Sequence, residues 1–128
     1  MVIVQFSQIN NDMNMLILED DNGRIDQFRK NLIGHKVITT DQAHECIDLL
    51  KEHEWDILFL DHDLGGEAFV NSDNKNTGAE VARFLNEHPK YKPEIVIVHS
   101  LNPVGAKLMT DLIPGSRRIP YAWEMELD

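Results

Sequence analysis

The fold of this chain is decided by the stretch Asp56–Gly66, whose sequence is DILFLDHDLGG. A short apolar run led in by an acidic residue is typical of a strand that is buried on both faces of a parallel sheet. Asp61, His62 and Asp63 follow the run directly. We therefore expect three ionisable groups at the carboxyl edge of a sheet, where open α/β folds bind their ligands.

Two other apolar runs end in polar residues in the same way. Met15–Leu18 leads into acids, and Glu94–Val98 leads into a histidine and small polar residues. The residues concerned are Glu19, Asp20, Asp21, His99, Ser100 and Asn102. Because the carboxyl ends of parallel strands meet at one edge of a sheet, these clusters indicate a site.

Helical patterns alternate with these strands. Apolar residues recur at helical spacing over Asn22–Leu32, Gln42–His53, Thr77–Asn86 and a segment from Pro103 to the stop at Pro114. Further short strands are expected at His35–Thr39 and around Arg118–Trp123. The alternation predicts one α/β domain, in which helices cover both faces of a parallel sheet.

Polar residues at the helix starts predict where three of these helices begin. Thr40-Asp41 offers an N-cap to the second helix. Thr77–Glu80 has the capping-box pattern, and Asn102-Pro103 combines an N-cap with proline at the first helical position. A polar loop, Gly65–Asn76, joins the central strand to the third helix.

Residues 1–14 are set apart from a domain over residues 15–128. Val2–Phe6 is strand-like, and polar residues follow it. The segment is either an N-terminal extension or an extra edge strand, and the sequence does not decide between them.

Composition limits the classes of function. The chain has 128 residues and a net charge of −10, which disfavours a general nucleic-acid binder because phosphate contacts need clustered Lys and Arg. We see no apolar stretch of membrane-spanning length and no signal-peptide pattern. The single Cys46 excludes an internal disulfide and suits a core position. We expect a cytoplasmic protein.

Several short motifs together resemble one divergent branch of the receiver domains of response regulators, the cyclic-phosphate processing receiver domain. The motifs are LEDD (18–21) with Arg24, FLDHDLGG (59–66), VHSLNPVGA (98–106) and YAWE (121–124). The resemblance spans Met15 to Trp123. It implies a three-layer, flavodoxin-like fold with a five-stranded parallel sheet in the order 2-1-3-4-5, without the last receiver helix.

The resemblance to ordinary receivers also implies a phosphoacceptor at Asp61. The acid pair of that family matches Asp20-Asp21 or Glu19-Asp20. His99 stands where receivers have Thr or Ser, and Arg117-Arg118 runs where they have Lys. A Mg²⁺-dependent signalling relay through Asp61 is therefore an alternative hypothesis, and a scaffold without catalysis is a third.

The leading hypothesis is a phosphoesterase that acts through two histidines. His62 and His99 can serve as base and acid on a cyclic phosphate, because each imidazole exchanges its proton near neutral pH. Asp61 or Asp63 can hold one imidazole in the needed tautomer. The competing interpretation is that these histidines only bind loop backbone.

The crowded carboxylates predict a cation. Asp20, Asp21 and Asp61 are the expected ligands of Mg²⁺, and a nearby histidine leaves a transition metal open. Asp20 or Asp21 could instead only cap the following helix.

Substrate contacts are expected from Ser100, Asn102 and Arg24. The expected partner is a small molecule with a phosphate, or an RNA end.

Overall fold

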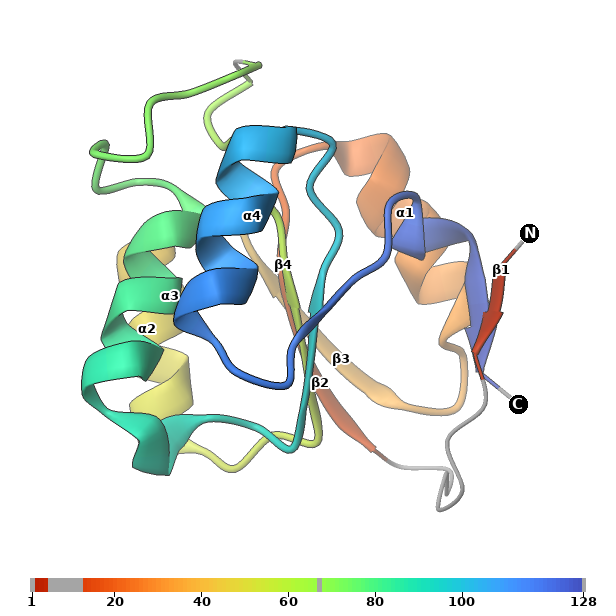
Figure 1. Ribbon diagram of the computed structural model, residues 1–128. Helices are drawn as coiled ribbons and strands as arrows, with labels where there is room; N and C mark the ends of the chain where they lie inside the picture. The colour runs from red at the N-terminus through yellow and green to blue at the C-terminus, as the bar shows by residue number, and fades with distance from the viewer. Residues whose placement is uncertain (1, 5–12, 67, 128) are drawn as a thin grey trace.

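A computed structural model describes residues 2–4, 13–66 and 68–127 (Figure 1). Its centre is a parallel sheet of five strands, in the order β3-β2-β4-β5-β6. Counted from the strand at Met15, this is the order 2-1-3-4-5 that the resemblance to receiver domains implied. The strands are β2 (Asn14–Leu18), β3 (Lys36–Thr40), β4 (Ile57–Leu60), β5 (Ile95–Val98) and β6 (Arg117–Arg118).

Helices cover both faces of the sheet. On one face lie α2 (Ala43–Glu52), α3 (Gly78–Glu87) and α4 (Pro103–Leu112), and on the other lies α1 (Asn22–Asn31) (Figure 1). Strand alternation divides the core accordingly, since Leu16 and Leu18 pack with the three helices while Met15 and Ile17 pack with α1. The result is the predicted three-layer architecture.

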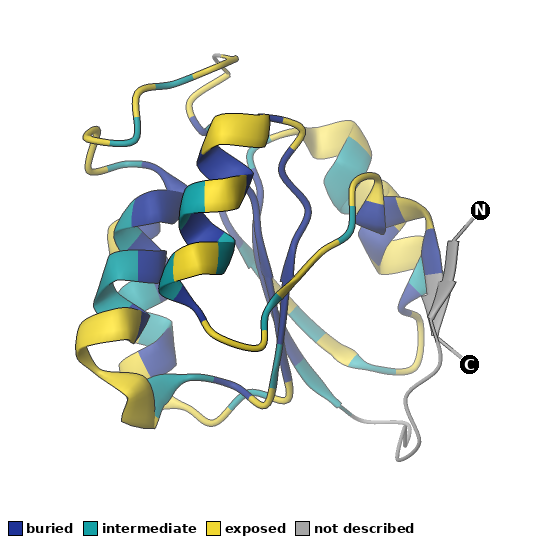
Figure 2. Ribbon diagram, in the orientation of Figure 1, coloured by how far each residue is buried: buried dark blue, intermediate teal, exposed yellow. Residues whose placement is uncertain are grey.

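The two central strands are the most deeply buried. All four residues of β4 and the last four of β2 are buried, and Figure 2 shows them between the helix layers. A strand covered on both faces needs apolar residues at consecutive positions, which explains the runs that predicted these strands.

Two of the predicted helix caps form differently. Thr77 precedes α3, but its side chain makes no cap hydrogen bond; its hydroxyl donates to the carbonyl of Asn74 instead. The N-cap of α2 is Gln42 rather than Thr40-Asp41, and the backbone N–H of Ala43 donates to Asn76 Oδ1. A residue of the distant polar loop therefore caps α2, which local sequence cannot predict.

The end of the chain replaces the predicted strand near residues 118–123 by shorter pieces. After β6 the backbone turns at Tyr121, whose φ of 62° is left-handed, into the 3₁₀ helix η2 (Ala122–Glu124). The strand β7 (Met125–Leu127) follows and pairs in parallel with β1 (Val2–Val4). These two strands form a separate sheet, and residues 5–12 of the N-terminal segment lie outside the described residues.

Between β6 and Leu127 the described chain contains no α-helix. Instead, η2 lies beside α1, where Asn31 Nδ2 donates to the carbonyl of Trp123 at 2.8 Å. A short helix of 3₁₀ type, η1 (Pro89–Tyr91), was not predicted. Within the described residues, no helix is long and apolar enough to cross a membrane.

Candidate functional site

Strand register brings three ionisable residues together at the carboxyl edge of the sheet. Leu18, Leu60 and Val98 are register partners across β2, β4 and β5, so the residues that follow them also lie side by side. These are Glu19, Asp61 and His99, each at most 3 % exposed. One possible ligand atom from each lies within 4.8 Å of the others. Among the described residues, these three form the one group of acids and histidine close enough together to hold a metal ion. The group contains Glu19, which we had not predicted as a ligand.

Glu19 is held in its charged form. Its Oε1 lies 3.1 Å from His99 Nε2, and its Oε2 accepts the backbone N–H groups of Asp20 and Asp21. Burial by itself raises the pKa of Glu19, but His99, the Asp21 N–H and Arg24 together lower that pKa to about 2.

Asp61 has the opposite protonation tendency. Burial and the neighbouring Glu19 carboxylate raise the pKa of Asp61 to about 8, against the hydrogen bond from the His62 N–H and the charge of Arg24. Near neutral pH, Glu19 and Asp61 together therefore carry one negative charge rather than two. A bound cation would favour the second charge.

Arg24 reaches over this carboxylate pair from the first turn of α1. Its Nη1 lies 3.8 Å from both Glu19 Oε1 and Asp61 Oδ2. Its guanidinium also stacks on the Trp123 ring, 4.4 Å from the ring centroid. The side chain keeps 31 % of its surface exposed, so it joins the buried acids to the solvent-facing pocket.

His99 is enclosed between aromatic rings below this edge. Phe28 and Trp123 meet it edge-on, with ring centroids 5.2 and 6.2 Å away. Among the described residues, His99 Nδ1 is the one buried side-chain nitrogen or oxygen that has no hydrogen-bond partner. Such an atom normally finds a partner, so the imidazole has a donor or ligand position left over.

His62 belongs to a second, adjacent group. Its Nδ1 lies 2.8 Å from Asp63 Oδ1, and its Nε2 lies 2.8 Å from Ser72 Oγ. The ring is fully buried, and Gly105 in α4 packs so closely against it that a methyl group there would overlap the ring. No hydrogen bond or ring contact joins His62 to His99 in the part of the chain that the structure describes.

Ser72 was not predicted as part of the site. It comes from the loop between Gly65 and Asn76, ten residues beyond its partner His62. Arg83 of α3 donates to the Ser72 carbonyl at 2.9 Å. Ser72 is therefore held through both its hydroxyl and its backbone carbonyl. A loop without periodicity gives no pattern from which this contact could be predicted.

Asp63 organises the same loop. It accepts the backbone N–H groups of Phe69 and Val70 at 2.7 and 3.0 Å, and the amide of Asn102 at 3.2 Å. Partial burial raises the pKa of Asp63, but the hydrogen bonds from His62, Asn102 and the loop outweigh it and lower the pKa. Asp63 is therefore placed as the charged partner of the His62 imidazole.

The other two predicted metal ligands have structural contacts. Asp21 Oδ1 accepts the Arg24 N–H at 3.0 Å and so caps α1, which was the alternative we left open. Asp20 Oδ2 accepts the Gly66 N–H at 2.6 Å, and burial raises the pKa of Asp20. Both residues border the same pocket as Asp61, outside the compact group of Glu19, Asp61 and His99.

The predicted substrate contacts at the start of α4 are used within the protein. Asn102 Oδ1 accepts the N–H groups of Val104 and Gly105, each at 3.1 Å, and Ser100 Oγ accepts the N–H of Asn102. The helix start is therefore capped by its own side chain. Arg118 of β6 donates to the Ser100 carbonyl at 3.3 Å.

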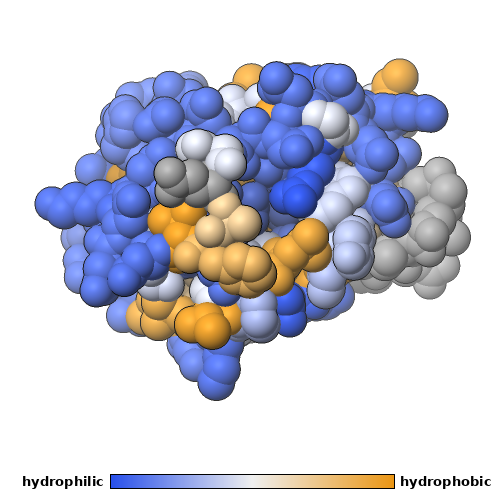
Figure 3. Space-filling model, turned by 90° about the horizontal axis from the view of Figure 1, so that it is seen from above, coloured by the Kyte–Doolittle hydropathy of each residue, from blue (hydrophilic) through white to orange (hydrophobic). Residues whose placement is uncertain are grey.

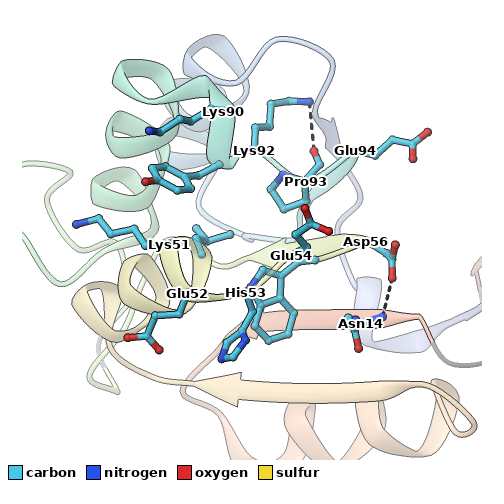
Figure 4. Close-up of a pocket in the computed structure, with 13 residues that line it drawn as sticks. Asn14, Lys51, Glu52, His53, Glu54, Asp56, Lys90, Lys92, Pro93 and Glu94 are labelled. Carbon is cyan, nitrogen blue, oxygen red and sulfur yellow. Dashed lines mark hydrogen bonds between the residues drawn. The ribbon is translucent and has the colours of Figure 1, made fainter.

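A pocket of about 570 Å³ opens above these groups. Its polar wall includes Arg24, Asp61 and Asp63, and its apolar wall includes Phe69 and Leu101. Figure 3 looks down on this edge and shows apolar side chains gathered on an otherwise hydrophilic face. A second pocket of about 610 Å³ lies at the opposite, amino edge of the sheet (Figure 4).

The family model described as "Cyclic-phosphate processing Receiver domain" matches residues 15–114. No protein of curated function matches the chain.

Solved structures of receiver domains share the fold. The phosphorylated cyanobacterial phytochrome response regulator RcpA is 20% identical with a TM-score of 0.63, over 84% of this chain and 79% of that one. The Mn²⁺-bound response regulator Rcp1 is 18% identical with a TM-score of 0.60, over 83% and 79%. A CheY-like receiver domain protein from Methanospirillum hungatei JF-1 is 16% identical with a TM-score of 0.60, over 85% and 82%. At these identities the likeness supports the fold alone.

Proposed function

Because the chain belongs to the cyclic-phosphate processing receiver domain family, we propose that this receiver of response-regulator type is a phosphoesterase. Its substrates are cyclic or terminal phosphates of nucleotides or RNA ends, bound in the pocket above Asp61. The observation that carries the proposal is the buried group of Glu19, Asp61 and His99 beneath the Arg24 guanidinium. Ordinary receivers do not need a histidine at that position.

The residues present fit a divalent cation. Glu19 and Asp61 supply two carboxylates whose oxygens lie close enough to bind one ion, within a group whose ligand atoms are at most 4.8 Å apart. Oxygen donors suit Mg²⁺, and His99 Nε2, 3.1 Å from Glu19 Oε1, remains free of the ion for proton transfer. When bound, the cation would neutralise carboxylate charge and polarise a phosphate oxygen.

Arg24 supplies the positive charge of the chain itself. Its distance of 3.8 Å from both carboxylates is longer than a direct hydrogen bond, so the guanidinium is available to phosphate oxygens. Stacking on Trp123 fixes its plane. In this proposal Arg24 binds and orients the phosphate beside Asp61.

The two histidines move the protons. Asp63 holds His62 so that Nδ1 carries its proton toward the carboxylate and Nε2 accepts one. His62 takes the proton of the attacking water as the water oxygen bonds to phosphorus. His99 gives a proton to the ribose oxygen as its bond to phosphorus breaks. His62 is fully buried, and its Nε2 is hydrogen-bonded to Ser72 Oγ. Its role as base therefore requires Ser72 to release Nε2 when substrate binds.

The test is hydrolysis of nucleoside 2′,3′-cyclic phosphates with Mg²⁺, Mn²⁺ or EDTA. We expect His62→Gln and His99→Gln each to lower turnover by about 100-fold or more, the usual contribution of a general acid or base. His53→Gln is the matched control, because His53 is exposed at the other edge of the sheet. Full turnover in the double variant, with an unchanged unfolding curve, would contradict the proposal.

One observation favours a second function, phosphorylation of Asp61. Its side chain is 5% exposed, borders the pocket and follows β4, where receivers have their phosphoacceptor. Against this, His99 occupies the Thr or Ser position, and β6 carries Arg117-Arg118 where Lys is expected. Acetyl phosphate with Mg²⁺ should then add one phosphoryl group that Asp61→Asn prevents. An unchanged intact mass would exclude this function.

A further inference from the structure

The structure assigns a nucleobase subsite to the apolar wall formed by Phe69 and Leu101, so that the substrate is a nucleoside phosphate rather than a phosphate alone. This inference rests on the proposed function, because it takes the phosphate to lie against Arg24 and Asp61. The wall and these polar residues line one pocket of about 570 Å³. That volume is within the range of small-ligand sites, about 300–1,000 Å³.

The side chain of Phe69 is exposed to solvent, although a phenylalanine is normally buried in the core. It is 73% exposed, and Leu101 on the facing loop is 37% exposed. Among the described residues, no aromatic ring or cation is in contact with the Phe69 ring. Figure 3 shows apolar side chains gathered on this otherwise hydrophilic face. A flat, unpartnered ring beside a phosphate site suits stacking by a base.

The backbone of Phe69 is held in an unfavourable conformation. Its φ of 54° is left-handed, which is rare for a bulky aromatic residue and costs free energy. Two hydrogen bonds to Asp63, from the N–H groups of Phe69 and Val70, hold it there. Nearby, the Gly66 N–H is bound to Asp20. Carboxylates that border the pocket therefore fix the backbone that carries the Phe69 ring.

Charge decides between a mononucleotide and a longer chain. The net charge is −10, and Asp20, Asp21 and Asp63 border the pocket. Each added phosphate would meet this negative surface without the Lys and Arg clusters that polynucleotide binding needs. The substrate that fits is thus a single nucleoside with one phosphate, and its base supplies binding energy that charge does not.

The experiment is calorimetric titration with adenosine 3′-monophosphate and with inorganic phosphate, both in Mg²⁺. We expect Phe69→Ala to weaken nucleotide binding by about 5- to 150-fold, the range that stacking on one aromatic ring provides. Phosphate binding should not change, and Phe69→Tyr should retain nucleotide affinity. Val104→Ala is the matched control, since Val104 is 75% exposed at the start of α4 but does not line the pocket.

Three results would overturn the inference. They are a Phe69→Ala protein that binds the nucleotide like wild type, a wild type that binds it no better than phosphate, and tighter binding of an oligonucleotide with a 3′-phosphate. Hydrolysis separates the two proposals. If a cyclic phosphate that has no base is hydrolysed as fast as the cyclic nucleotide, and Phe69→Ala changes neither rate, the subsite is excluded and the phosphoesterase proposal stands. Phe69-dependent binding without turnover removes the phosphoesterase and keeps the subsite.

Discussion

The two edges of the sheet carry pockets of similar size, but their ionisable groups differ in sign and in burial. The carboxyl-edge pocket has a volume of about 570 Å³, and the amino-edge pocket about 610 Å³. Beneath the first, Glu19, Asp61, His62 and His99 are all buried. Around the second, Lys51, Glu52, His53, Glu54 and Lys90 are exposed, as Figure 4 shows for their extended side chains.

The difference shows that shape alone does not identify a functional site. Exposed charges of both signs at the amino edge remain hydrated and need no partners. Burial of ionisable groups costs free energy, so a fold retains them where they serve a purpose or have strong partners. The carboxyl edge meets this criterion, and the following predictions test whether its buried groups differ from the exposed ones in measurable ways.

The largest expected effect is that of Asp61→Asn on stability against pH. The pKa of Asp61 is raised in the folded chain, so its protonated form contributes stability at low pH that is lost as the pH rises toward about 8. We expect the variant to unfold with a free energy higher than wild type at about pH 8, by on the order of 3–5 kcal/mol, and with a smaller difference near pH 5. Urea unfolding across this range measures it.

Asp56→Asn is the control at the amino edge. Asp56 is exposed and accepts the N–H of Asn14 at 2.8 Å. Its replacement should change the free energy of unfolding by about 1 kcal/mol or less. Mg²⁺ or Mn²⁺ should stabilise wild type and the Asp56 variant but not Asp61→Asn. Equal responses of both variants to pH and metal would remove the distinction between the two edges.

The sequence predicted the sheet well because its central strands are buried on both faces. Consecutive apolar residues in β2, β4 and β5 have no other common explanation, and their ends fixed which edge carries the polar residues. Asn102 was predicted as the cap of α4 and is one. Local pattern was sufficient for this cap, whereas the capping box predicted at Thr77 did not form, because its hydroxyl donates to Asn74 instead.

The site was less predictable because its partners come from distant segments. Among three consecutive acids, sequence could not show that Glu19 would face His99, eighty residues away, while Asp21 capped α1. The contact of Ser72 with His62 and the stacking of Arg24 on Trp123 depend on how a loop and the chain end pack. These contacts have no periodicity that a sequence could reveal.

The next effect is expected from Gly105→Ala, which tests how closely His62 is packed. A methyl group on Gly105 would overlap the His62 ring. Alanine favours a helix by about 1 kcal/mol over glycine, yet we expect a net loss of stability of about 1–3 kcal/mol from overpacking. Lys107→Ala, on the exposed side of the same helix, should change stability by about 0.5 kcal/mol or less. Unfolding curves measure the change in stability, and NMR of the His62 imidazole shows whether the ring moves. A stabilised variant in which the ring has not moved would show that the packing around His62 is loose.

The smallest effects are expected at the amino edge, from Lys51→Ala and Lys90→Ala. Lys51 Nζ lies 5.4 Å from the Phe84 ring centroid and Lys90 Nζ 4.9 Å from that of Tyr91, and the two rings stack on each other. Exposed contacts of this kind contribute about 0.5–1 kcal/mol, so unfolding should change by no more than that. Neither nucleotide titration nor cyclic-phosphate turnover should change. A loss of nucleotide or phosphate binding would mean that the amino-edge lysines hold the ligand, and not Arg24 and the carboxyl-edge pocket.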